Sequence, residues 1–213
     1  MSLTETENVF AGLHETGLND LLTAFFSARP RLLNYRTSSA VVNTPPSPTA
    51  WTTMPVIAFP GVEGGIEYAV QFSIPQVDIH PESAALPPPL ILGGGQIALR
   101  TAVEFTLLCR RVDDDQKPIS VRLEVVALGR VVVRTVGLGT GSVSFDLLRV
   151  EIVNITPDAL ESLIECLVLT LLRAALESLA LPFSAIRAGA FSLNLTRGPE
   201  AETDQLKLYG SAV

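Results

Sequence analysis

The sequence predicts an α+β fold in which a long, strongly twisted antiparallel sheet is covered on its dry face by two apolar helices. Residues 156–181 have the start, stop and leucine spacing of a long helix. Several segments between residues 66 and 153 alternate apolar and polar side chains, as strands with one buried face do. The chain is 47% hydrophobic and 17% charged, against a usual charged share of about 25%. This apolar excess needs a large core, a membrane, an oligomer interface or an apolar cavity.

The segment 156–181 is expected to form the central helix. Thr156 suits the N-cap, Pro157 occupies the first turn, where its missing N–H costs nothing, and Pro182 ends the helix. Leucines at i, i+3, i+4 and i+7 spacing form a broad apolar face. Further leucines interrupt the charged strip opposite, so we expect this helix to be apolar over most of its surface and largely covered.

The other elements follow from the same periodicities. Residues 14–28 have helical spacing and are expected to form a shorter N-terminal helix. The apolar parity shifts after Pro75 and between Leu147 and Leu148, which predicts a bulge or bend at both places. Strands are expected at residues 32–42, 66–74, 97–109, 119–127, 131–138, 143–153, 188–195 and 205–209.

We expect a single domain over residues 1–213, in which residues 1–10 form a loose polar arm. The Pro- and Gly-rich connector at 81–95 is a possible boundary, but neither flank has the elements of a self-sufficient domain.

Charge and cysteine content limit the partners and the compartment. A net charge of −7 disfavours nucleic acid, whose phosphates attract clustered Lys and Arg. The first ten residues lack the basic and apolar stretches of a signal peptide, and two cysteines without ligand spacing fit a reducing cytoplasm. Export by a non-classical route stays open. No integral membrane segment is expected, because the uncharged run 166–172 is far shorter than the roughly 20 residues of a span.

No catalytic or metal-binding signature stands out, so we expect no enzyme activity, cofactor or metal. His14 and His80 have no partner nearby in the sequence, and the three acidic residues 113–115 fit a solvated hairpin tip better than a calcium loop. The glycines at 137, 139 and 141 are followed by an expected strand. A phosphate-binding loop requires a helix there, so a tight hairpin is favoured.

The segments GLNDLLTAFF, IEYAVQFSIPQVDIHP and VSFDLLRVEIVNITPDALESLIECLVLTLLRAAL together resemble the tubular lipid-binding (TULIP) superfamily. That superfamily includes the bactericidal/permeability-increasing proteins, synaptotagmin-like lipid-transfer domains and bacterial members of toxin clusters. The resemblance covers most of the chain as a pattern of elements and supplies no site motif. It implies a highly curved sheet wrapped around the long helix, with a lipid held between them.

Two functions fit these features. The first is non-enzymatic binding of a lipid-like or other hydrophobic ligand, such as a fatty acid, in a cavity between sheet and helices. The second is a structural or assembly role in an oligomeric, phage-like or toxin-associated particle, because apolar surface also marks homo- and hetero-oligomer interfaces. The sequence does not separate an open cavity from a filled core. The residues expected to line the cavity are Leu21, Leu22, Phe25, Phe72, Phe105, Leu160, Leu163, Ile164, Leu167 and Leu171.

Overall fold

The computed structural model describes residues 7–38, 40, 50–58, 60–80, 85–109, 118–137, 140–153, 158–183, 187–188 and 191–212. The α-helices within these residues are α1 (Glu15–Ala28) and α2 (Asp158–Glu177), and a short 3-10 helix spans Pro30–Leu32. The strands are β1 (Val9–His14), β2 (Asn34–Thr37), β3 (Thr52–Met54), β4 (Ile66–Phe72), β5 (Gln76–Asp78), β6 (Ile97–Cys109), β7 (Ile119–Gly137), β8 (Thr140–Val153), β9 (Leu181–Phe183), β10 (Arg187–Ala188), β11 (Phe191–Glu202) and β12 (Gln205–Ala212).

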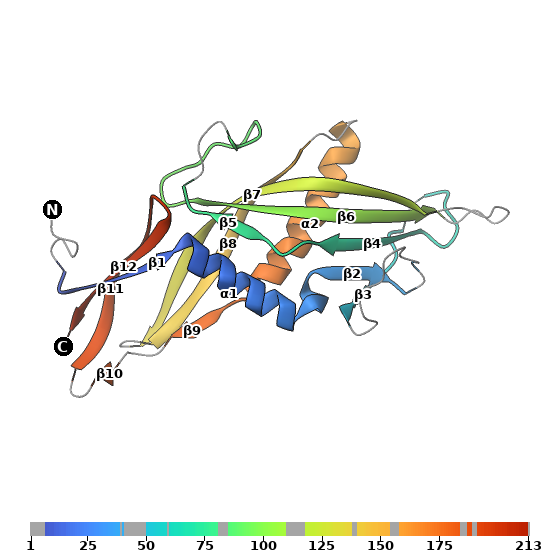
Figure 1. The fold of residues 1–213 in the computed structure, drawn as a ribbon. Helices are drawn as coiled ribbons and strands as arrows, with labels where there is room; N and C mark the ends of the chain where they lie inside the picture. The colour runs from blue at the N-terminus through green and yellow to red at the C-terminus, as the bar shows by residue number, and fades with distance from the viewer. Residues whose placement is uncertain are drawn as a thin grey trace.

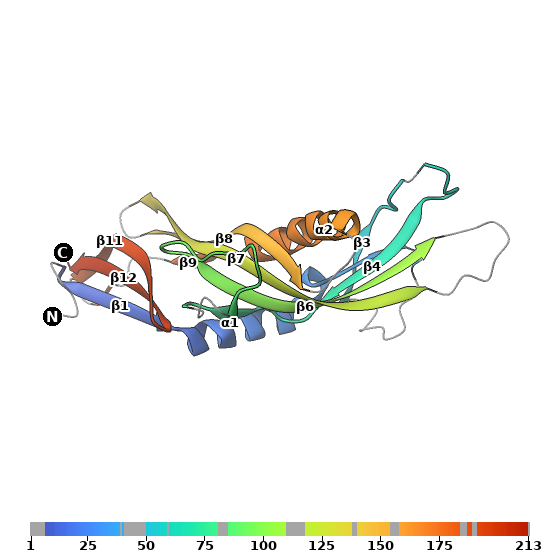
Figure 2. The same ribbon diagram turned by 90° about the horizontal axis from the view of Figure 1, so that it is seen from above.

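The strands form two sheets (Figure 1). The main sheet has the order β3-β2-β4-β6-β7-β8-β9, with β5 also paired to β6, and a smaller sheet has the order β1-β12-β11-β10. The α+β class is confirmed. The prediction of a purely antiparallel sheet is wrong at one edge, because β2 and β3 run parallel. Figure 2 shows the main sheet curling along its length, with the smaller sheet at one end of the elongated molecule.

Strand β7 is one 19-residue strand where two were predicted. β7 stays continuous because the extra residue that changes the parity lies in β8. Leu128 pairs with Arg149 and Gly129 pairs with Leu147, so Leu148 is the extra residue of a bulge. A Cβ at position 129 would lie 2.9 Å from the Asp146 carbonyl oxygen, so glycine permits the close approach of the two strands. The predicted bulge between Leu147 and Leu148 is confirmed.

The predicted break near Pro75 separates β4 from β5, and both strands pair with β6. Side chains replace the missing ladder bonds there. The Ala102 N–H donates to Ser73 Oγ at 2.8 Å, and the Thr101 hydroxyl donates to the Ser73 carbonyl at 2.8 Å. The bend therefore keeps the backbone groups of β6 hydrogen-bonded.

One apolar cluster joins both helices, the main sheet and the small sheet. α1 supplies Leu18, Leu22 and Phe26, and β12 adds Leu206. A second, smaller cluster covers the opposite face of the sheet and contains Leu86, Leu90, Ala98, Val126 and Leu128. The central strands are therefore apolar on both faces near β6 and β7, where the sequence analysis expected one dry face and one wet face.

Helix α2 packs against β8 (Figure 1) and is covered on one side only. Its buried side carries Ile164, Val168, Leu171, Leu172, Ala175 and Leu176. Its exposed side carries Ser162, Cys166, Thr170, Arg173 and Glu177, so the part of α2 whose side chains are described is amphipathic. Neither helix in the described ranges is long and apolar enough to cross a membrane.

Side chains from both helices hydrogen-bond the backbone at the edges of the main sheet. The Asn19 amide on α1 donates to the Val77 carbonyl at 3.0 Å and accepts from the Val77 N–H at 2.6 Å. On α2, Arg173 donates to the Leu147 carbonyl at 3.0 Å. These contacts fix each helix to the strand that it covers, β5 for α1 and β8 for α2.

A buried tyrosine joins β2 to α2. The Tyr35 hydroxyl donates to the Leu32 carbonyl at 2.6 Å and lies 3.3 Å from the Leu171 carbonyl. Burial raises the pKa of Tyr35 to about 12, so the phenol keeps its proton and acts as a donor across the ordinary pH range.

Candidate functional site

The predicted lining residues with described side chains come together between the helices and the sheet. Five of them are buried in the main core cluster, and three are half-buried and pack against it. Leu160 and Leu163 belong to α2, but their side chains lie outside the described part of the structure. The buried five are Leu22, Phe72, Phe105, Ile164 and Leu171, and the half-buried three are Leu21, Phe25 and Leu167.

These residues contact one another as parts of a packed core, and their role in ligand binding stays a prediction. Leu22 is 0% exposed and Ile164 3%. The Phe25 ring, at the margin, packs edge-on against Phe26 with centroids 5.2 Å apart. The open grooves around the described part of the sheet are lined mainly by other residues.

A groove lined largely by apolar residues lies between α2, β8 and the segment at residues 89–90. It has a volume of about 330 Å³. Its apolar wall consists of Pro89, Leu90, Leu148, Val150, Cys166 and Leu169, and its polar rim of Arg149, Glu151, Ser162 and Glu165. We call it the α2–β8 groove.

Two residues that break the regular apolar pattern of the sequence line this groove. Leu148 is the extra residue of the β8 bulge, and a bulge re-aims side chains relative to the regular pleat. Leu169 is one of the leucines on the otherwise charged strip of α2. Both positions are half-buried. The sequence signals for the groove were therefore the parity shift in β8 and the leucine outside the main apolar face.

The floor of the groove is continuous with both core clusters. Val150 and Leu169 pack against the main cluster, whereas Leu90 belongs to the second cluster, with which Val153 also packs. The groove is therefore the place where the apolar layers on the two faces of the sheet both reach the surface.

The rim combines charged and hydroxyl groups. The Glu165 carboxylate accepts the Ile152 N–H at 3.4 Å, so this side chain also ties α2 to β8. Arg149 and Ser162 are exposed, and Cys166 is a free, exposed thiol. The apolar and polar side chains that together line this groove match a molecule with an apolar tail and a polar head.

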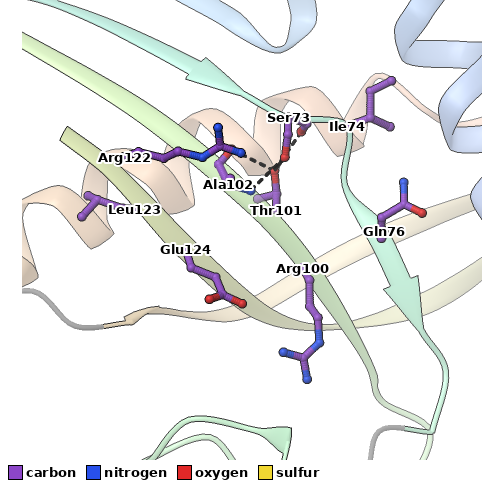
Figure 3. Close-up of a pocket in the computed structure, with 9 residues that line it drawn as sticks. All are labelled: Ser73, Ile74, Gln76, Arg100, Thr101, Ala102, Arg122, Leu123 and Glu124. Atoms are coloured by element: carbon purple, nitrogen blue, oxygen red, sulfur yellow. Dashed lines mark hydrogen bonds between the residues drawn. The ribbon is translucent and has the colours of Figure 1, made fainter. Parts of the chain in front are cut away.

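A second depression lies on the outer face of the sheet, at the break between β4 and β5 (Figure 3). It has a volume of about 480 Å³ and is lined mainly by polar residues, including Arg100, Arg122 and Glu124. In Figure 3 the Ser73 and Thr101 hydroxyls hydrogen-bond each other and the backbone. Both hydroxyls are engaged in closing the strand break.

A third groove of about 420 Å³ runs along β7 and β8 beside the end of α2, and includes Arg130, Arg134 and Glu177. Arg130 forms an ion pair with Asp146 at 2.9 Å. The groove thus presents charges of both signs, which favours no particular ligand charge.

The described histidines and acidic residues form no metal-binding group. The His14 ring accepts the Thr16 N–H at 3.2 Å and caps α1. Across these same residues, no three His, Cys, Asp or Glu side chains are grouped as metal ligands. Residues 113–115 and Gly139 lie outside the described ranges. Gly137 ends β7 and Gly141 lies in β8, so a strand and not a helix follows these glycines.

Comparisons with known proteins find only a distant likeness. No family model matches the chain, and no curated protein matches it. Among solved structures, a crystal structure of lipopolysaccharide binding protein is similar over 70% of this chain, with 12% sequence identity and a TM-score of 0.35. The matched region covers 32% of that protein. A likeness of this size indicates no function for the present chain.

Proposed function

We propose that the protein binds an amphipathic, lipid-like molecule in the α2–β8 groove without transforming it. One observation carries this proposal: the groove has an apolar floor that continues into both core clusters and a polar rim beside it. The apolar tail lies against Leu148, Val150 and Leu169, and the polar head stays at the rim near Arg149.

The size and lining of the groove suit such a ligand. Small-molecule sites span about 300–1,000 Å³, with mostly apolar walls and a few polar groups that fix orientation. The α2–β8 groove, at about 330 Å³, is at the small end and holds part of a chain. Each square ångström of tail surface removed from water contributes about 25 cal/mol.

The residues predicted from the sequence form the deeper wall in this proposal. Leu167 and Ile164 lie on α2 within one turn of Cys166, and Leu167 is half-buried against the core. A longer tail reaches them by passing between α2 and the sheet. The groove is then the mouth of the binding site.

A charge on the groove floor tests the proposal. We expect Leu169→Glu to weaken oleic acid binding at least about tenfold, which corresponds to about 1.4 kcal/mol, because a carboxylate beside an apolar tail loses its hydration. The affinity is measured by fluorescence titration with a fluorescent fatty acid displaced by oleic acid, and occupancy by native mass spectrometry.

Thr170→Glu is the matched control, because it adds the same charge to the next residue of α2, which is exposed and outside the groove lining. We expect it to bind oleic acid like the unaltered protein. Equal affinities for both variants, or no oleic acid binding by the unaltered protein, would refute the proposed function.

A further inference from the structure

Strand β1 is the outer strand of the small sheet, and within the described residues it pairs only with β12. Figure 2 shows it along the outer side of that sheet. Its sequence, VFAGLH, contains no acidic residue, lysine, arginine or proline. Residues 11–14 are exposed, and Leu13 is 42% exposed. The edge therefore presents backbone N–H and C=O groups together with apolar side chains.

The hydrogen bonds show which backbone groups face outward. The Glu15 N–H donates to the Asp204 carbonyl at 2.8 Å, and the pairing with β12 runs without a shift from Val9 to His14. Hydrogen-bonded positions alternate in an antiparallel pair. Val9, Ala11 and Leu13 thus direct their N–H and C=O groups to β12, whereas Phe10 and Gly12 direct theirs outward.

Natural sheet edges are commonly protected by a lysine, a proline, a bulge or a covering segment, because an unprotected edge pairs with another strand. Strand β1 contains none of the first three. It is also uncharged between Val9 and Leu13, in a chain of net charge −7. Two copies that meet along Val9 to Leu13 therefore place no like side-chain charges of these residues opposite each other.

We propose that two copies of the chain pair antiparallel through β1, with Ala11 of one copy opposite Ala11 of the other. This pairing does not rest on the proposed lipid binding. In this register Phe10 and Gly12 of opposite copies form the hydrogen-bonded pairs, which uses the outward backbone groups identified above. The two small sheets join into one continuous sheet across a two-fold axis at Ala11.

The side chains of β1 are self-complementary in this register. Leu13 lies opposite Val9, so apolar groups meet, and the Phe10 ring, which in each copy lies over its own Gly12, has no large side chain opposite it. If the register moves by one hydrogen-bonded pair in one direction, Phe10 lies opposite Phe10. If it moves in the other direction, His14 lies opposite Phe10. The two-fold axis forms each favourable pair twice, which favours a second copy over an unrelated strand.

Charges of opposite sign at position 11 test the pairing. We expect the unaltered protein to be a dimer by sedimentation equilibrium, and Ala11→Lys and Ala11→Glu each to be monomers, because like charges then face each other across the axis. An equimolar mixture of the two variants is expected to recover the dimer. The dimer re-forms on mixing only if position 11 of one copy lies opposite position 11 of the other. Two misfolded variants would not re-form the dimer.

The matched control carries the same charges at Ile119, which is 73% exposed and lies on β7 of the main sheet, paired with Leu107 and not with the small sheet. Ile119→Lys and Ile119→Glu are expected to remain dimers. Circular dichroism spectra show whether the variants at position 11 keep the fold. An unaltered protein that is a monomer at every concentration, or an Ala11→Lys variant that remains a dimer, overturns the proposal.

A disulfide reports the register directly. Opposite residues in a non-hydrogen-bonded antiparallel pair have Cα atoms about 4.5 Å apart, which is within the disulfide range. We expect Ala11→Cys to form an inter-chain disulfide at position 11 under mild oxidation, identified by peptide mass spectrometry, and Leu13→Cys to form none at position 13. Cross-linking of Leu13→Cys without Ala11→Cys overturns the assigned register.

Discussion

Replacing Leu172 with alanine is expected to lower the free energy of unfolding by about 2–5 kcal/mol. Leu172 is 0% exposed on α2 and belongs to the main core cluster. Its truncation removes buried apolar surface and leaves a cavity that the surrounding helices and strands fill only in part. Chemical denaturation followed by circular dichroism measures the loss as a lower midpoint with an unchanged slope.

Leu167→Ala is the matched control on the same helix, because Leu167 is only half-buried. We expect it to cost about 1 kcal/mol or less, since a smaller surface leaves the core. Equal losses for the two variants would mean that the buried side of α2 is not the side assigned here.

Replacing Asn19 with alanine is expected to lower the free energy of unfolding by about 2–4 kcal/mol, from two lost hydrogen bonds at about 1–3 kcal/mol for each buried group left unpaired. The Asn19 amide satisfies both backbone groups of Val77, a residue that is 2% exposed. Alanine is a better helix former than asparagine by less than about 1 kcal/mol, so it offsets only part of the loss.

Asp20→Ala is the control, because Asp20 is the next residue of α1 and is exposed. Its effect is expected to stay within about 0.5 kcal/mol. Asn19→Asp separates the two bonds, since it keeps an acceptor for the Val77 N–H and loses the donor to the Val77 carbonyl. An Asn19→Ala protein as stable as Asp20→Ala would show that β5 is not held by α1 in this way.

The sequence predicted the elements whose periodicity is long and unbroken. Strand β6 spans Ile97–Cys109, the range predicted from its alternation, and α1 ends at Ala28, before Arg29-Pro30. The bulge at Leu148 followed from a change of parity within one strand. Local pattern is sufficient in these cases because each element has a buried face of its own.

The pairing of distant short strands was not predictable from local pattern. β1 pairs with β12, almost a full chain length away, and β2 pairs in parallel with the three-residue β3. Such short segments carry too few residues to show a period. β7 continues past its predicted end because the bulge lies in its partner β8 and not in β7 itself.

Part of the apolar core was predictable, but the residues that line the candidate groove were not. Sequence spacing brought Leu22, Phe105 and Ile164 into one apolar cluster, which the structure contains. The α2–β8 groove was missed, because it depends on Leu148 leaving the regular pleat and on Leu90 arriving from a proline-rich connector. Periodicity does not determine where such a connector lies on the sheet.

The alkylation rate of Cys166 in the unaltered protein most directly tests whether the α2–β8 groove holds a lipid-like tail. Cys166 is exposed and lines the groove, so a bound molecule covers its thiol. With saturating oleic acid we expect N-ethylmaleimide to modify Cys166 at least about tenfold more slowly, as measured by peptide mass spectrometry, and the Leu169→Glu variant to show no such protection. The contradicting result is an unchanged alkylation rate in the unaltered protein at an oleic acid concentration where native mass spectrometry shows the ligand bound. The ligand would then lie outside the α2–β8 groove.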